Sequence, residues 1–124
     1  LLGIGTKGTV RDDIALAINR INQSGLPIIS LDIPSGLNPD TGAASGPVVA
    51  ASKTISFIAL KQGLLTGKGP AVCGELHLAD LQIPQSILNT QQSKTHRILL
   101  DEQLAKLKPR KADAHKGDFG HVMV

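Results

Sequence analysis

Apolar residues recur along the first part of the chain with the spacing of a helix. Between residues 12 and 23 they lie on one helical face, at Ile14, Ala17, Ile18 and Ile21. Two acids open that segment, where they suit the positive end of a helix dipole, and a glycine at position 25 follows it as a stop signal. The pattern therefore predicts a helix over residues 12–23.

Three short apolar runs predict strands. The run PIISLDI, residues 27–33, is uncharged up to its aspartate, which is typical of a strand covered on both faces. Two further runs lie at 53–58 and 75–81, and the segments before them, 34–47 and 59–74, are rich in glycine and predict loops. A helix followed by separate strands indicates an α/β fold with a parallel sheet, in which the later crossovers lack helices.

The rest of the chain is more polar. Residues 84–93 are rich in Gln, Ser, Asn and Thr and predict a linker. Residues 98–107 form a short amphipathic stretch, in which we expect Asp101 as the N-cap and Leu104 and Leu107 as the inner positions. The chain then reads DAHKGDFGHVMV, which indicates a glycine turn followed by a new apolar strand.

Composition narrows the class of protein. The 124 residues are 41% hydrophobic and 19% charged, as in a globular domain with a core. Aromatic residues make up 2%, so the core is expected to be aliphatic, and base-stacking nucleic-acid modules are disfavoured. No run of 18 apolar residues occurs, and the single cysteine, Cys73, fits a reducing compartment. We therefore expect a cytoplasmic protein that binds neither nucleic acid nor membrane.

The net charge of +3 changes this picture little. The basic residues are concentrated between positions 94 and 116, where they are interpreted as a solvated surface, with a phosphate-binding lip as the alternative. The four histidines have no metal-ligand spacing and are interpreted as non-ligands.

A glycine-rich segment is the first candidate for chemistry. Residues 3–8 read GIGTKG and precede the predicted helix. Glycines in this context let the backbone approach a ligand closely, and free amides at a helix start favour anions. The spacing fits both a dinucleotide-phosphate loop and an ordinary glycine turn, and the residues alone leave both open.

Asp32 is the second candidate, because it ends the first predicted strand in the sequence SLDIPSG. Ligands of open parallel sheets bind at the carboxyl ends of strands, so this carboxylate suits binding or acid/base chemistry. A turn aspartate is the simpler alternative. Ser35 follows, and oxygen groups beside a carboxylate suit a hard cation. Lys61, in a predicted surface loop, is a weaker acid/base candidate and is interpreted as a solvated side chain.

The order of the motifs resembles that of the NAD(P)H-hydrate epimerase family. The segments that carry the resemblance lie within residues 1–84 and are LLGIGTKG, SLDIPSGLNPDTG, KTISFIALKQGLLTGKG and GELHLADLQIP. Further on, HKGDFGHVMV resembles the opening of the ADP-dependent dehydratase domain that follows the epimerase domain in bifunctional repair enzymes. The resemblance implies a partial Rossmann-like three-layer αβα epimerase domain over 1–84, a linker with a short helix over 85–110, and the first strand of a ribokinase-like α/β dehydratase domain over 111–124.

The resemblance also implies a reaction and assigns roles to residues. The reaction is the epimerisation of the R and S forms of NADH hydrate and NADPH hydrate at carbon 6 of the nicotinamide ring. In a full-length bifunctional protein it is coupled to ADP-dependent dehydration back to NAD(P)H. Asp32 becomes a substrate-binding and acid/base residue, and Ser35 a ligand of a potassium ion. The loop around the substrate phosphates comprises Gly3, Ile4, Gly5, Thr6, Lys7, Gly8 and Thr9.

The family pattern also contains parts that this sequence lacks. A second potassium-ligating aspartate and an asparagine-containing loop precede the Leu-Leu pair, and the dehydratase nucleotide site follows Val124. We therefore expect an interior piece of a homo-oligomeric enzyme, inactive by itself in both reactions. The alternative is a non-catalytic dinucleotide-binding module of Rossmann type. The spacing is also compatible with half of a Rossmann dehydrogenase, since Asp32 lies 24 residues after Gly8.

Overall fold

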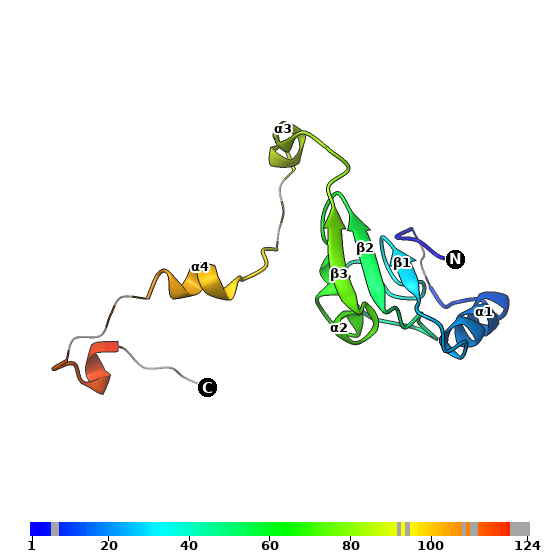
Figure 1. Cartoon of the computed structure of the whole chain (residues 1–124), viewed down its shortest axis with the longest axis horizontal. Coiled ribbons are helices and arrows are strands. Elements are labelled where there is room, and N and C mark those ends of the chain that lie inside the picture. Colours follow the sequence, from blue (N-terminus) through cyan, green and yellow to red (C-terminus); the bar gives the residue numbers. More distant parts are fainter. Residues whose placement is uncertain (6–7, 92, 94, 108, 110–111, 120–124) are drawn as a thin grey trace. The chain divides into compact units, whose positions relative to one another are not determined.

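The computed structural model describes residues 1–5, 8–91, 93, 95–107, 109 and 112–119, which belong to two compact units. One unit spans Leu1–Gln92 and the other Ser93–Val124. The first unit contains a helix and a parallel sheet (Figure 1). It therefore has the α/β fold predicted from the pattern of apolar residues.

The sheet has three strands in the order β1-β2-β3, and both neighbouring pairs are parallel. They are β1 (Ile29–Leu31), β2 (Lys53–Phe57) and β3 (Glu75–Ala79). The register places Leu31 opposite Ile55, and Phe57 opposite Ala79. All three predicted strands are confirmed, although each is shorter than the apolar run that predicted it. The carboxyl ends of β1 and β2 lie side by side at one edge of the sheet.

Helix α1 (Asp12–Asn22) confirms the helical periodicity to within one residue. Asp12 and Asp13 occupy its first turn, and Ile18 on its inner face is completely buried. Gly25 follows with a φ of 69°, a left-handed conformation that glycine adopts without a steric penalty. The helix therefore ends where the sequence placed its stop signal.

The connection between β2 and β3 contains two short helical segments, so the prediction of crossovers without helices is wrong. These segments are η1 (Gln62–Leu64) and α2 (Gly69–Val72). Their glycines mask a helical pattern in the sequence, but they are required by close packing against the preceding loop. A Cβ atom added to Gly63 would lie 2.1 Å from the carbonyl oxygen of Asn38. Pro70 falls in the first turn of α2, where proline is tolerated.

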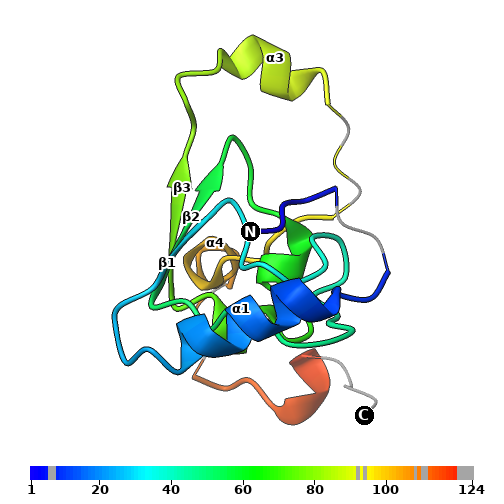
Figure 2. The same ribbon diagram turned by 90° about the vertical axis from the view of Figure 1, so that its right-hand side faces the viewer.

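The two faces of the sheet differ in burial. Ser30, Thr54 and Ser56 point to the buried face. Figure 2 shows the sheet nearly edge-on, with α1 and the connection between β2 and β3 on one side of it. On the opposite face Ile29 and Leu31 remain 61% and 65% exposed. The prediction that the first strand is covered on both faces is therefore wrong for the described part of the chain, in which no element packs over these two side chains.

The core is aliphatic, as the composition predicted. One buried cluster within it comprises Ile33, Leu37, Leu64 and Cys73, and Val48, Val72 and Leu76 pack against this cluster. The hydroxyl of Thr54 donates a 2.7 Å hydrogen bond to the carbonyl of Cys73, which satisfies a polar group inside this core. Burial raises the pKa of the Cys73 thiol above its usual value, and a hydrogen bond with Thr54 partly offsets this increase.

The segment after β3 contains three short helical elements: α3 (Gln85–Asn89), α4 (Leu100–Leu104) and η2 (Lys116–Phe119). Helix α3 lies inside the predicted linker. The residue that caps α4 is Leu99, so the prediction of Asp101 as N-cap is wrong.

The predicted inner face of this helical stretch is also wrong. Leu104 is half-exposed and Leu107 is exposed, because no described element packs over them. The last apolar run of the sequence predicts a strand over residues 119–124. Phe119 belongs to η2, and residues 120–124 lie outside the described part of the chain. None of the helices in the described ranges is long and apolar enough to cross a membrane.

Candidate active site

Asp32 is the first residue after β1, and its backbone adopts a left-handed conformation with a φ of 67°. Its own N–H donates to the carbonyl of Ile55 on β2, at 2.7 Å. The next N–H, of Ile33, donates back to the carbonyl of Leu31 at 2.9 Å and closes a three-residue γ-turn. The chain therefore turns sharply at Asp32 and leaves the carboxylate at the carboxyl end of the sheet.

The neighbouring strand ends in the same way. Ile58 also has a φ of 67°, its N–H donates to Ala79 on β3 at 2.7 Å, and the N–H of Ala59 donates back to Phe57 at 2.7 Å. A left-handed conformation is uncommon for aspartate and unfavourable for a β-branched side chain such as isoleucine. Strained residues of this kind cluster at functional sites. Here the second turn sends the chain back over the strand ends toward Asp32.

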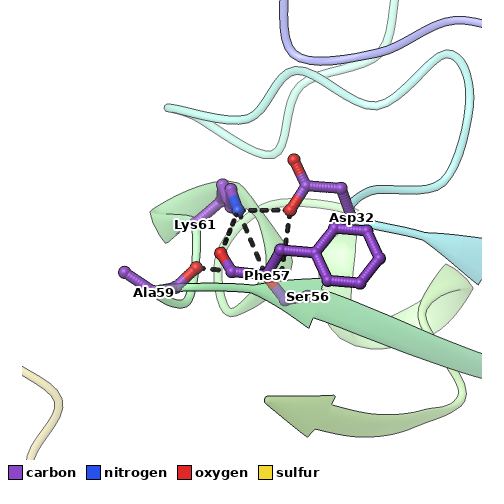
Figure 3. A network of polar contacts seen from close by, with 5 residues as sticks. All are labelled: Asp32, Ser56, Phe57, Ala59 and Lys61. Carbon is purple, nitrogen blue, oxygen red and sulfur yellow. Dashed lines mark hydrogen bonds and ion pairs between the residues drawn. The ribbon is translucent and has the colours of Figure 1, made fainter. Parts of the chain in front are cut away.

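Lys61 contacts Asp32 across these two turns. The ammonium of Lys61 forms an ion pair with Oδ1 of Asp32, and the N–H of Phe57 donates to the same oxygen at 3.1 Å (Figure 3). The two charged side chains are 23% and 20% exposed, for Asp32 and Lys61 respectively. The prediction that Lys61 is a solvated surface side chain is therefore wrong.

Two further oxygens surround the ammonium. Lys61 also donates to the carbonyl of Phe57 at 2.8 Å and to Oγ of Ser56 at 3.4 Å. Ser56 is completely buried, and its hydroxyl donates to the carbonyl of Ala59 at 3.1 Å. The lysine is thus held by the strand end and by the turn that precedes it. No described residue is hydrogen-bonded to Oδ2 of Asp32, which points away from the lysine (Figure 3).

Ser35 is buried and bonded to the amino-terminal segment. Its Oγ accepts the N–H of Leu2 at 3.0 Å and donates to the carbonyl of Leu2 at 3.1 Å. A hydroxyl oxygen has two acceptor lone pairs, so one remains after these contacts. Ser35 also lines a mainly apolar pocket of about 280 Å³ with residues of β1 and with Leu1 and Leu2.

The predicted phosphate loop lies beside the segment that follows Ser35. Gly3 and Gly8 line a pocket of about 120 Å³, and its other walls are Val10, Gly36, Leu37, Asn38, Ala43 and Ser45. Ile4 is exposed, and Thr6 and Lys7 lie outside the described residues. Helix α1 begins only at Asp12, after Thr9 and two further residues, so the loop does not lead directly into the helix.

The structure therefore brings some predicted residues together and leaves others apart. Gly3 and Gly8 share a pocket with the loop that follows Ser35, whereas no hydrogen bond or ion pair among the described residues joins Ser35 to Asp32. The sequence interpretation missed the pairing of Lys61 and the supporting role of Ser56. A signal for the pairing was present, because Lys61 lies four residues after the end of β2, and the ends of neighbouring parallel strands lie at the same edge of a sheet.

A family model described as "YjeF-related protein N-terminus" matches residues 1–63, which is half of the chain and includes Asp32, Ser35 and Lys61. The chain belongs to this family. The matched range contains the glycine loop, α1, β1 and β2 and the two γ-turns. The geometry of the candidate site is thus a feature of a YjeF-related domain.

Individual relatives are similar over most or all of the chain. The bifunctional NAD(P)H-hydrate repair enzymes of Escherichia coli and Coxiella burnetii are 44% and 43% identical, over 124 and 125 residues. The NAD(P)H-hydrate epimerase of Legionella pneumophila (strain Corby) is 38% identical over 101 residues, which is 82% of this chain and 37% of that protein. The chain spans about a quarter of the length of the two bifunctional relatives.

Proposed function

We propose that the protein carrying this chain is an NAD(P)H-hydrate epimerase, with Asp32 as its acid/base residue. The observation that carries the proposal is the carboxylate at the end of β1, which is held by Lys61 and Phe57 through Oδ1 and has Oδ2 without a described partner. The substrates are NADH hydrate and NADPH hydrate. The names of the similar proteins support this substrate class.

Epimerisation inverts the carbon that carries the added hydroxyl. Oδ2 of Asp32 first takes up a proton from solvent and gives it to the departing hydroxyl, which leaves as water with the electron pair of the broken C–O bond. The lone pair of the ring nitrogen stabilises the resulting cation as an iminium until water adds to the opposite face of the ring and releases a proton, which returns to Oδ2 through solvent. One group that first donates and then accepts a proton closes this cycle without an oxidant or reductant.

The glycine loop is assigned to the substrate phosphates. The pocket that it forms with residues 36–38 is lined by backbone of three glycines, Gly3, Gly8 and Gly36. Backbone of this kind can approach a phosphate closely and donate N–H groups to it. Ile4, Gly5, Thr6, Lys7 and Thr9 complete the proposed loop.

Ser35 is assigned to a potassium ion. Its Oγ keeps one lone pair after the contacts with Leu2, and an uncharged hydroxyl oxygen is a hard ligand that suits such a cation. Ser35 therefore fits one ligand position of a potassium site, and the carbonyl oxygen of Leu2 lies beside this position. When bound, the ion would supply positive charge close to the substrate.

The remaining parts of the proposal concern the larger protein. The first unit is assigned to a Rossmann-like three-layer αβα domain, which is supported by the apolar side chains of Ile29 and Leu31 on its uncovered face. Residues 111–124 are assigned to the beginning of an ADP-dependent dehydratase domain of ribokinase-like fold, and residues 85–110 to the linker. The intact protein is proposed to be a cytoplasmic homo-oligomer, and the 124 residues alone to be inactive.

The test of the proposed activity is stereochemical. A single purified epimer of NADPH hydrate is incubated with the intact natural protein that carries this sequence, and the other epimer is quantified by chiral separation. The proposal expects the mixture to reach equilibrium faster than in a protein-free sample. Binding of the hydrate without acceleration would instead favour a non-catalytic dinucleotide-binding module.

A further inference from the structure

Lys61 has no proton left for the substrate, because its surroundings use all three. A lysine ammonium has three donors and no acceptor. Here the donors have three acceptors within the network: Oδ1 of Asp32, the Phe57 carbonyl and Oγ of Ser56. The side chain is four-fifths buried, so bulk water contributes little to its solvation. The lysine is therefore placed to hold its neighbours and not to transfer a proton.

The contacts of Asp32 involve only one of its two carboxylate oxygens. Oδ1 receives both the Lys61 ammonium and the Phe57 N–H, whereas Oδ2 has no bond to a described residue. Two donors on one oxygen fix the rotation of the carboxylate group (Figure 3). They also concentrate the bound positive charge on Oδ1, so Oδ2 is the oxygen that remains to exchange a proton.

The backbone turn at Ile58 holds Lys61 in position beside Asp32. The γ-turn at Ile58 reverses the chain so that Lys61 can donate to Phe57, four residues earlier. Ser56 is bonded to Ala59 inside the same turn and accepts from the lysine. A lysine exposed to solvent would require neither the strained turn nor a buried hydroxyl such as that of Ser56 as an acceptor.

From this geometry we infer that Lys61 is a positioning residue, which orients the Asp32 carboxylate so that Oδ2 faces the reacting carbon of the substrate. The inference rests on the proposed epimerase function, and it gives a second charged residue a role beside Asp32. Lys61 acts through Asp32 and touches no substrate atom. Its removal therefore lowers kcat and leaves KM unchanged within about twofold, because a carboxylate displaced by about 1 Å costs on the order of 10²-fold in rate.

A double-mutant cycle in the intact natural protein tests the inference. The variants are Lys61→Met, Asp32→Asn and their combination, with Lys68→Met as the matched control, because Lys68 is exposed and lies outside the network. We expect Lys61→Met to lower kcat about 10²-fold and to have no further effect in the Asp32→Asn background. A lysine that acts on the substrate itself would lower kcat again in that background, and this result would overturn the inference, as would a normal kcat for Lys61→Met.

A second readout does not depend on activity. The amide of Phe57 donates to Oδ1, so its NMR chemical shift reports the position of the carboxylate. We expect this signal to shift in Lys61→Met and to stay unchanged in Lys68→Met. Lys61→Gln, which keeps a donor without the charge, replaces Lys61→Met if the latter does not fold. A shifted Phe57 signal in a protein that fails to epimerise would refute the proposed function and leave the positioning role intact, whereas an unchanged signal would refute the positioning role.

Discussion

Asp32 and Ile58 occupy equivalent places at the ends of neighbouring parallel strands. Each directly follows its strand, each has a φ of 67°, and each donates its N–H to the next strand of the sheet. The first turn places the carboxylate of the candidate site, and the second brings Lys61 back to it. The same backbone device, used twice, therefore builds both halves of the ion pair.

The strain at Ile58 predicts an unusual effect of substitution. Ile58→Asn replaces a β-branched residue by one that tolerates the left-handed region, so we expect the free energy of unfolding to rise by about 1 kcal/mol. The matched control is Ile55→Asn on the preceding strand β2, where strain is absent and a half-buried apolar side chain is lost. Urea unfolding of the intact protein checks both. A fall in stability for Ile58→Asn as large as that for Ile55→Asn would show that the turn stores no strain.

The assignment of Ser35 predicts a specific dependence on cations. We expect replacement of potassium by lithium to lower epimerase activity, and EDTA to leave it unchanged, because oxygen ligands bind a monovalent ion weakly and EDTA captures divalent metals. Ser35→Ala should remove the difference between the two cations and cost about 1 kcal/mol, since the Leu2 N–H and carbonyl lose their partner. Strong inhibition by EDTA would point to a divalent metal instead.

The buried thiol predicts a dependence of stability on alkaline pH. The pKa of Cys73 is raised above 9.0 by burial, so the folded protein keeps a proton that the unfolded chain loses above that pH. We therefore expect the free energy of unfolding to fall as the pH rises past about 9, by at most about 1.4 kcal/mol per pH unit. Urea midpoints measured from pH 8 to pH 10 check this. Cys73→Ala should reduce the slope, and an identical slope in both proteins would contradict the assignment.

The boundary between the two units predicts a site of proteolysis. In the intact protein we expect limited digestion to cut within residues 91–94 and to release two compact pieces, because few contacts cross a domain boundary. The amino-terminal piece should keep the epimerase activity. The isolated 124 residues, by contrast, should melt without a sharp transition, since Ile29 and Leu31 remain uncovered. A cooperative melt of this chain alone would show that the proposed domain boundaries are wrong.

The sequence predicted the elements that have a long or regular pattern. The four apolar positions of α1 and the three strand runs were sufficient for the helix, the strands and their parallel arrangement. The sequence did not predict the segments η1 and α2, because they are too short to show a helical repeat of apolar residues. They also contain glycines, which close packing requires. The prediction that Leu104 and Leu107 are buried was wrong. A pattern of apolar residues shows which side chains can be buried, but it does not show whether another element covers them.

Of the two charged residues of the candidate site, only Asp32 could be predicted from the sequence. Asp32 follows from a carboxylate at the end of an apolar strand, a rule that depends on local sequence alone. Lys61 does not, because its pairing depends on the register of β1 with β2 and on a left-handed isoleucine that no propensity favours. The roles of Ser35 and of the glycine loop came from the family resemblance and stay predictions.

The most direct test of the account is the rate of epimerisation in Asp32→Asn, which keeps the shape of the side chain and removes its charge and basicity. The exposed Asp40→Asn is the matched control. Each intact protein is given one purified epimer of the hydrate, and the spontaneous rate is subtracted after chiral separation. The account predicts a loss of about 10²–10⁴-fold for Asp32→Asn and none for Asp40→Asn. Turnover near that of the wild type in a folded Asp32→Asn protein would contradict it.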